Sequence, residues 1–277
     1  MSLLSLAHFT VIEADPLALI DAGAAAGFDA VGLRIVPPPG AAPIVPVVGD
    51  AAMQRQIKAR LAATGMKILD TEAIWLLPET DVSSLVPALD TSAELGARHL
   101  IVCGNDPDRA RTLENLARLC EASHLRGLRV MLEFLPYTEI RGLAEAHAVL
   151  EAIKPANAGV LVDAVHLSRS KGSPADLASY DPALFSLVHL CDVPAEMPSF
   201  EGLRAEARGG RLYPGEGGLW LDEFVGAFSE DVAFAIEAPS ARHAALPPVA
   251  RAKKAADAAR ALLDRVRRHG GSVPRAG

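Results

Sequence analysis

Residues 161–166 read LVDAVH, an apolar run that ends at Asp163 and is followed by His166. Runs of this kind are typical of strands buried on both faces, as in a parallel sheet. A carboxylate at the end of such a strand is costly to bury unless it is paired or binds a metal. Two questions follow from Asp163: which sheet contains this strand, and what the carboxylate contacts.

Short apolar runs alternate with longer helix-like segments along the whole chain. We expect strands at 4–13, 30–36, 66–74, 99–104, 129–134, 158–164, 186–193 and 231–238. Helices are expected at 15–28, 50–63, 83–96, 107–126, 140–153, 174–185, 219–228 and 246–267, with a long loop before 219. Eight strand–helix units in 277 residues predict a single-domain (β/α)8 TIM barrel over 1–269, with a loose C-terminal tail at 270–277. The alternative is a doubly wound open sheet, which is disfavoured because no glycine-rich phosphate fingerprint follows the first strand.

Charge and composition narrow the function classes. The net charge of −7 argues against a nucleic-acid surface, which needs clustered lysine and arginine. Apolar runs fall short of the ~18 residues of a membrane span, so no membrane association is expected. The three cysteines form neither a CxxC motif nor a disulfide framework, and the N-terminus does not resemble a signal peptide, so we expect a cytoplasmic protein. A homodimer is the default expectation for oligomeric state.

Four of the expected strands end in residues that can ligate a metal: Glu133, Asp163, His189 and Glu237, on the fifth to eighth strands. Barrel enzymes place their chemistry at the carboxyl ends of the strands, so these side chains are expected to converge. Each has an ordinary alternative, which is a helix cap for Asp163, core packing for His189 and an ion pair with Arg242 for Glu237. The position of all four residues on consecutive strands favours a shared cation, because the three adjacent carboxylates would otherwise repel one another.

The donor set consists of three carboxylates and one imidazole. It suits Mn²⁺ or Mg²⁺ better than a thiolate-preferring structural zinc, with Co²⁺, Zn²⁺ and Fe²⁺ as alternatives. Cys191 lies two residues after His189 and therefore on the same side of the strand. Packing is the simpler interpretation for this cysteine.

The set E…DxxH…H…E, with PGEG after the seventh strand, resembles the xylose-isomerase-like barrels, also called the sugar phosphate isomerase/epimerase superfamily, which includes ketose 3-epimerases and inosose-processing enzymes. The resemblance extends over essentially the whole chain. It implies that Glu133, Asp163, His189 and Glu237 bind the metal. It also implies that Glu133 and Glu237 act as acid and base, and that His166 contacts a substrate oxygen.

Several arginines are candidates for substrate binding. In the epimerase branch an arginine three residues before PG contacts substrate, and RLYPGEG places Arg211 there. The segment before it is longer than in the ketose epimerases, so Arg204 and Arg208 are alternatives and a different lid is expected. Arg34 and Glu72 end the second and third strands, where Arg34 could bind a substrate carboxylate or phosphate, or could pair with Glu72.

These residues predict a divalent-metal-dependent isomerase or epimerase of carbohydrate metabolism, whose partner is a small polyhydroxy ketone such as a keto sugar or keto-inositol. The metal would make the C–H beside the carbonyl more acidic and stabilise an enediolate, while Glu133 and Glu237 shuttle the proton. A lyase or dehydratase acting on a keto sugar or 3-keto glycoside is the first alternative, because the same enolate could expel a neighbouring oxygen. A nuclease resembling endonuclease IV and a non-catalytic sugar-binding barrel are more remote alternatives.

Overall fold

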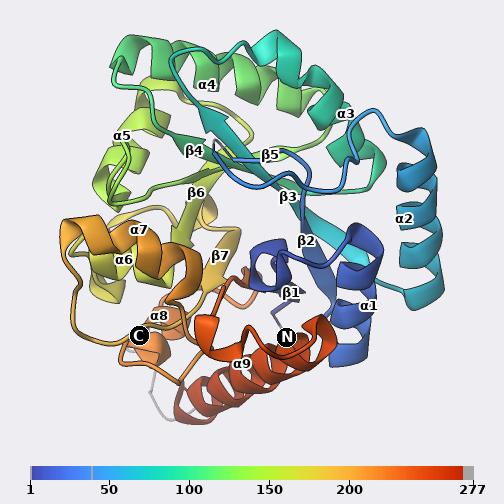
Figure 1. The fold of residues 1–277 in the computed structure, drawn as a ribbon. Helices are drawn as coiled ribbons and strands as arrows, with labels where there is room; N and C mark the ends of the chain where they lie inside the picture. The colour runs from blue at the N-terminus through green and yellow to red at the C-terminus, as the bar shows by residue number, and fades with distance from the viewer. Residues whose placement is uncertain (1, 39, 271–277) are drawn as a thin grey trace.

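The computed structural model describes residues 2–38 and 40–270. Within these ranges, eight parallel strands close into a barrel in the order β1 to β8, with β1 also paired to β8. Helices surround the barrel, and the long α9 lies close to α1 and the first strand (Figure 1). The (β/α)8 prediction is therefore confirmed.

The strands have three to ten residues, and the α-helices have six to 23. The strands are β1 (Leu4–Leu6), β2 (Ala30–Arg34), β3 (Lys67–Leu76), β4 (His99–Gly104), β5 (Arg129–Glu133), β6 (Ala158–Asp163), β7 (Leu187–Leu190) and β8 (Ala233–Ile236). The α-helices are α1 (Pro16–Ala26), α2 (Ala51–Thr64), α3 (Val86–Glu94), α4 (Arg109–His124), α5 (Leu143–Ile153), α6 (Ala164–Arg169), α7 (Phe200–Gly209), α8 (Leu221–Gly226) and α9 (Pro248–Gly270). Short 3-10 turns are η1 (His8–Val11), η2 (Val82–Leu85), η3 (Pro174–Ser179), η4 (Pro182–Leu184) and η5 (Ala241–His243).

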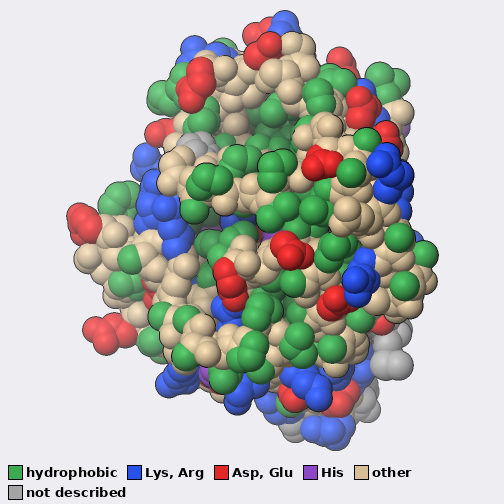
Figure 2. All heavy atoms as spheres, turned by 45° about the vertical axis from the view of Figure 1, so that its right-hand side comes forward, with side chains coloured by type: hydrophobic (Ala, Val, Ile, Leu, Met, Phe, Trp, Pro, Cys, Tyr) green, Lys and Arg blue, Asp and Glu red, His purple; other side chains and the backbone are tan. Residues whose placement is uncertain are grey.

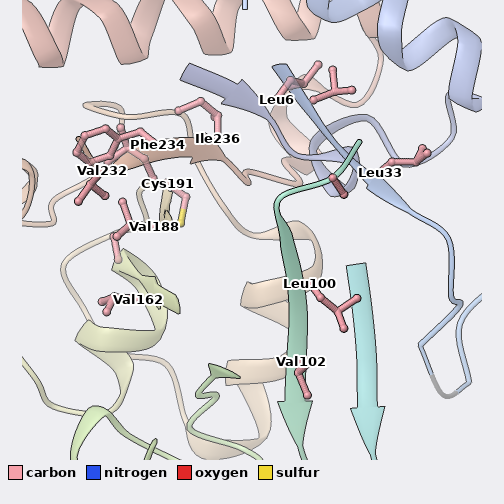
Figure 3. Close-up of a cluster of buried hydrophobic side chains, with 14 of the residues drawn as sticks. Leu6, Leu33, Leu100, Val102, Val162, Val188, Cys191, Val232, Phe234 and Ile236 are labelled. Carbon is pink, nitrogen blue, oxygen red and sulfur yellow. The ribbon is translucent and has the colours of Figure 1, made fainter. Parts of the chain in front are cut away.

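Alternation along the strands separates an inner from an outer layer. The inside of the barrel is filled by a small cluster: Ala30, Leu69, Ile101, Met131, Leu161, Leu187, Ala233 and Ala235. The intervening residues, such as Val188, Phe234 and Ile236, belong to the larger cluster that includes the helices (Figure 3). Because strand side chains alternate, a residue two positions after an inner one also faces the barrel interior.

The helix expected at 174–185 is not present. The chain instead forms α6 directly after β6, and 174–185 contains the two short turns η3 and η4. Pro182 begins η4, with Asp181 accepting a hydrogen bond from the amide of Ala183 at 2.9 Å. A proline ring clashes with the preceding turn of a helix, so a single helix cannot pass through this position.

The long loop expected before residue 219 contains α7. Ser199 caps this helix, accepting a hydrogen bond from the amide of Gly202 at 3.4 Å, and Leu203 and Ala207 are its buried residues. The first strand is also shorter than expected, because the chain turns into η1 after Leu6.

No helix among the described residues is both long enough and apolar enough to cross a membrane. On the face that Figure 2 shows, acidic and basic side chains are interspersed among hydrophobic ones. The tail expected at 270–277 lies outside the described residues, apart from Gly270, where α9 ends.

Candidate metal centre

The four expected ligands lie at inner positions where β5 to β8 end. Glu133, Asp163, His189 and Glu237 each follow, by two positions, an inner-layer residue of the same strand: Met131, Leu161, Leu187 and Ala235. All four are buried, and one ligand atom from each lies within 4.8 Å of those of the others. The strand alternation therefore brings together the residues that the sequence singled out.

His189 lies between the carboxylates. Its Nδ1 is 3.6 Å from Glu133 Oε1, 3.8 Å from Asp163 Oδ2 and 3.4 Å from Glu237 Oε2. Among the described residues, neither ring nitrogen of His189 nor Glu133 Oε1 has a hydrogen-bond partner. Buried polar atoms are normally satisfied, so this open set of oxygen and nitrogen donors fits a divalent cation.

The carboxylates also affect the protonation of His189. Burial by itself would lower the pKa of this imidazole, but Glu237 and Glu133 raise it well above its ordinary value. A histidine must lose a proton from the ligating nitrogen to bind a metal. A cation that enters the cluster therefore takes the place of a proton.

Arg211 is buried within the cluster, whereas Arg204 and Arg208 are exposed. Its Nη1 donates to Asp163 Oδ2 at 2.7 Å and to Glu237 Oε2 at 2.8 Å. Burial would raise the pKa values of Asp163 and Glu237, but the positive charges of Arg211 and His189 hold both below their ordinary values. Both carboxylates are therefore ionised at neutral pH.

Asp163 performs two tasks at once. Its Oδ1 accepts a hydrogen bond from the amide of His166 at 2.9 Å and so caps α6, while Oδ2 faces the cluster. Helix capping and metal binding are thus compatible for this residue. The ordinary alternative for Glu237 is not realised, because Arg242 contacts Glu216 Oε2 at 3.8 Å.

Two cysteine thiols adjoin ligand carboxylates. Cys103 Sγ donates to Glu133 Oε2 at 3.5 Å, and Cys191 Sγ lies 3.5 Å from Asp163 Oδ2. Burial raises the pKa of each thiol well above its ordinary value, so both are neutral donors. Cys191 is buried as expected, and it also hydrogen-bonds a ligand.

His166 lies next to Arg211 in this cluster. Its Nε2 is 3.1 Å from Arg211 Nη2. A guanidinium can only donate, so this nitrogen accepts and the imidazole is neutral. Burial lowers the pKa of His166 in the same direction.

Arg34 and Glu72 form a buried ion pair, with Arg34 Nη2 at 2.8 Å from Glu72 Oε2. The guanidinium also lies over the ring of Phe9, 4.5 Å from its centroid. Pairing, one of the two interpretations open for Arg34, is therefore realised. Among the described residues, Arg34 Nε and Glu72 Oε1 still lack hydrogen-bond partners.

A pocket of about 70 Å³ adjoins the cluster. Seven residues singled out from the sequence line it: Arg34, Glu72, Glu133, His166, Arg208, Arg211 and Glu237. The wall is completed by Phe9, Pro38, Ala73, Trp75, Cys103, Leu135, Tyr137 and Ala207. Several of these lie in loops, where a single sequence offers no periodic signal.

Asp70 is a buried acid that the sequence reasoning missed. The register between β2 and β3 shifts so that Leu69 joins the inner layer while Asp70 also lies inside, beside Gly32. Neither carboxylate oxygen has a hydrogen-bond partner among the described residues. Burial and the charge of Glu72 raise the pKa of Asp70 to about 8.

Comparisons with solved structures support the fold. A xylose isomerase-like TIM barrel/4-hydroxyphenylpyruvate dioxygenase fusion protein matches with a TM-score of 0.80 and 18% identity, over 99% of this chain and 45% of that one. The IOLI protein with a bound zinc atom matches with a TM-score of 0.72 and 17% identity, over 96% and 98%. D-allulose 3-epimerase from Methylomonas sp. matches with a TM-score of 0.68 and 18% identity, over 94% and 98%. At these identities the likeness shows the fold alone, and the chain spans less than half of the fusion protein.

A comparison of the sequence with curated proteins gives no match. A comparison with protein families matches residues 20–270 to the xylose isomerase-like TIM barrel. This range includes all four residues of the buried cluster and most of the pocket wall. The chain therefore belongs to the xylose isomerase-like TIM barrel family.

Proposed function

We propose that this protein is an enzyme that isomerises or epimerises a keto sugar, keto-inositol or related polyol, using one divalent cation, Mn²⁺ or Mg²⁺, held by Glu133, Asp163, His189 and Glu237. One observation carries the proposal. Two ligands of the cluster, Glu133 and Glu237, also line the adjoining pocket. The same two carboxylates can therefore face both a cation and a substrate.

A divalent cation in this cluster would supply Lewis acidity, which makes the C–H beside a carbonyl more acidic. Glu133 and Glu237 take and return the proton, a task that needs carboxylates within hydrogen-bond reach of the substrate. Arg211 keeps Glu237 ionised, and the Cys103 thiol orients Glu133. Return of the proton to the opposite face gives an epimer, and return to the next carbon gives an isomer.

The remaining polar groups of the wall bind substrate oxygens. His166 is neutral and positions an oxygen near Arg211. Arg34 Nε can donate to a hydroxyl and Glu72 Oε1 can accept from one, because both lack partners among the described residues. The pocket that these groups line has a volume of about 70 Å³ and adjoins the metal-ligand cluster.

Exchange with D₂O tests the proposal. The metal-loaded protein is incubated in D₂O with ketoses, keto-inositols, 3-keto glycosides, keto sugar acids and keto sugar phosphates, the metal is removed, and each compound is examined by NMR. We expect deuterium next to the carbonyl of one compound class with an intact carbon skeleton. Glu133→Gln and Glu237→Gln should abolish this exchange, while Glu79→Gln, on an exposed loop, should leave it unchanged.

Metal content is measured for every variant, which separates loss of the cation from loss of the acid or base. Exchange accompanied by loss of water or of an aglycone would assign a lyase in place of an isomerase. Absence of exchange across the panel, in protein that holds one cation per chain, would refute the keto-sugar proposal.

A further inference from the structure

The charges around the pocket can be paired one by one once a divalent cation is placed in the cluster, a step that rests on the proposed function. Glu133, Asp163 and Glu237 contribute three negative charges, which the cation and Arg211 balance. The buried ion pair of Arg34 and Glu72 is neutral by itself. These pairings leave one arginine of the pocket wall without an opposite charge.

That arginine is Arg208, on α7. It lines the pocket, and it has no ion-pair or hydrogen-bond partner among the described residues. An exposed arginine is usually just solvated. Arg208 differs from that case because it borders a pocket that is otherwise neutral once loaded, in a chain whose net charge is −7.

The position of Arg208 is determined by the packing of α7. Arg169 Nε donates to Glu206 Oε2 at 2.8 Å, and both side chains are nearly buried, which fastens α7 to α6. Ala207, the neighbour of Arg208, is itself buried and lines the pocket. The helix therefore holds the Arg208 backbone at the pocket wall.

A second arginine, Arg204, lies on the same side of α7 as Arg208. Arg204 precedes Arg208 by four residues, the spacing that places two side chains on one helix face. Its guanidinium lies 5.0 Å from the ring centroid of Tyr137, another residue of the pocket wall. Arg204 thus adds positive charge at the rim of the pocket.

Within the described part of the chain, the wall also contains buried hydrogen-bond donors without acceptors, alongside the partnerless acceptors Glu72 Oε1 and Glu133 Oε1, the second of which is a proposed metal ligand. Arg34 Nε and Arg211 Nε are buried and lack acceptors among the described residues, in addition to the free guanidinium of Arg208. Buried donors without acceptors are rare in native proteins. A ligand rich in acceptor oxygens would satisfy them.

We propose that the substrate carries one oxyanion, a carboxylate or a phosphate, and that Arg208 binds it at the pocket wall. The planar guanidinium matches both groups, because it can donate two parallel hydrogen bonds to either. The substrate class narrows accordingly from neutral keto sugars to acidic ones, either keto sugar acids or keto sugar phosphates.

Binding of unreactive compounds tests this inference separately from catalysis. Erythritol, erythronate and erythritol 4-phosphate differ only in one end group, and none has a carbonyl that could react. Their affinities for the Mn²⁺-loaded protein are measured by calorimetry. We expect one of the two anions to bind at least about tenfold more tightly than erythritol, the gain of roughly one hydrogen bond to a charged group. Whichever anion binds more tightly than erythritol shows whether the oxyanion of the substrate is a carboxylate or a phosphate.

Variants of Arg208 provide the decisive comparison. Arg208→Gln should remove the advantage of the anion and leave erythritol binding and Mn²⁺ affinity unchanged, whereas Arg208→Lys should retain part of it. Arg55→Gln changes another exposed arginine, on the outer helix α2, and should have no effect. Equal binding of all three compounds would overturn the inference. An anion advantage that persists in Arg208→Gln would mean that a group other than Arg208 binds the anion and would also overturn the inference. Neither result would affect deuterium exchange of a neutral ketose, so the proposed function would stand.

Discussion

Asp163 and Asp70 are both fully buried on the inside of the barrel, and they differ in the charges that surround them. Asp163 Oδ2 is 2.7 Å from Arg211 Nη1, and the pKa of this carboxyl lies below its ordinary value. Asp70 has no hydrogen-bond partner among the described residues, and its pKa is raised to about 8. Burial penalises the charged form of both, so the nearby cation decides which one ionises.

This difference has a consequence for the metal centre. Asp163 is ionised at neutral pH and can ligate a cation, whereas Asp70 is mostly protonated and neutral. Asp70 thus lies close enough to Glu72 and His189 for their charges to shift its pKa, but as a neutral acid it adds no negative charge near the cluster. The charge that a cation meets comes from the three carboxylates of the cluster and from Arg211.

Removal of Arg211 should make the surroundings of Asp163 resemble those of Asp70. Arg211→Met leaves Asp163 and Glu237 buried without the positively charged guanidinium that pairs with both. We expect the free energy of unfolding of the metal-free protein to fall by about 3–5 kcal/mol, as when one partner of a buried ion pair is removed. Urea unfolding at pH 7 measures this loss. Added Mn²⁺ should restore part of the stability, because a ligand that binds the folded state stabilises it.

Arg265→Gln is the matched control for this variant. Its ion pair with Asp222 is about 40% exposed on both sides and should contribute at most about 1 kcal/mol. An Arg211→Met protein as stable as the Arg265→Gln protein would mean that Asp163 and Glu237 do not depend on the guanidinium.

The three carboxylates of the cluster could be predicted from the sequence, but Asp70 could not. The reason is geometric. Glu133, Asp163 and Glu237 end apolar runs, so a barrel with its chemistry at the strand ends places them together. Asp70 lies inside KILDTEAI, where strict alternation assigns Leu69 and Asp70 to opposite faces. The register shift between β2 and β3 places both inside, and such a shift depends on the neighbouring strand.

The helix α7, between β7 and α8, was likewise not predictable from the sequence. A serine cap at Ser199 and the two buried residues Leu203 and Ala207 are a weak signal for a ten-residue helix. The glycines in SFEGLRAEARGG favour a loop on propensity alone. Arg208 could be named from the sequence as a candidate for substrate contact, but its unpaired position in the pocket wall depends on this helix.

The pKa of Asp70 predicts an unusual dependence of stability on pH. Its folded value of about 8 lies above the ordinary value, so as pH rises the unfolded chain releases this proton first. The contribution of Asp70 to stability is therefore fully present near pH 4 and is lost progressively up to about pH 8. The Asp70→Asn protein does not undergo this loss, so at pH 7 its free energy of unfolding should exceed that of the wild-type protein by up to about 4 kcal/mol. Urea unfolding of both proteins between pH 4.5 and 8 measures the difference.

Asp163→Asn should give the opposite slope. The pKa of Asp163 is lowered, so its contribution to stability is present at neutral pH and lost as pH falls through the folded value. The variant should therefore be destabilised most at neutral pH and least in acid. Parallel pH profiles for the Asp70→Asn and Asp163→Asn proteins would contradict the contrast between the two carboxyls.

A smaller effect is expected at Gly32, which makes room for Asp70. A Cβ atom at Gly32 would lie 2.5 Å from Asp70 Oδ2 and 2.9 Å from Oδ1. Gly32→Ala should therefore cost about 1–3 kcal/mol, the range for overpacking in a core. In an Asp70→Ala background the obstructing atoms are gone, and the same change should cost at least 1 kcal/mol less by the double-mutant cycle. Gly209→Ala, where nothing lies within 4 Å, should be nearly neutral. An equal cost of Gly32→Ala in both backgrounds would mean that the Asp70 side chain does not lie against Gly32, and the explanation of its burial by the register shift would fail.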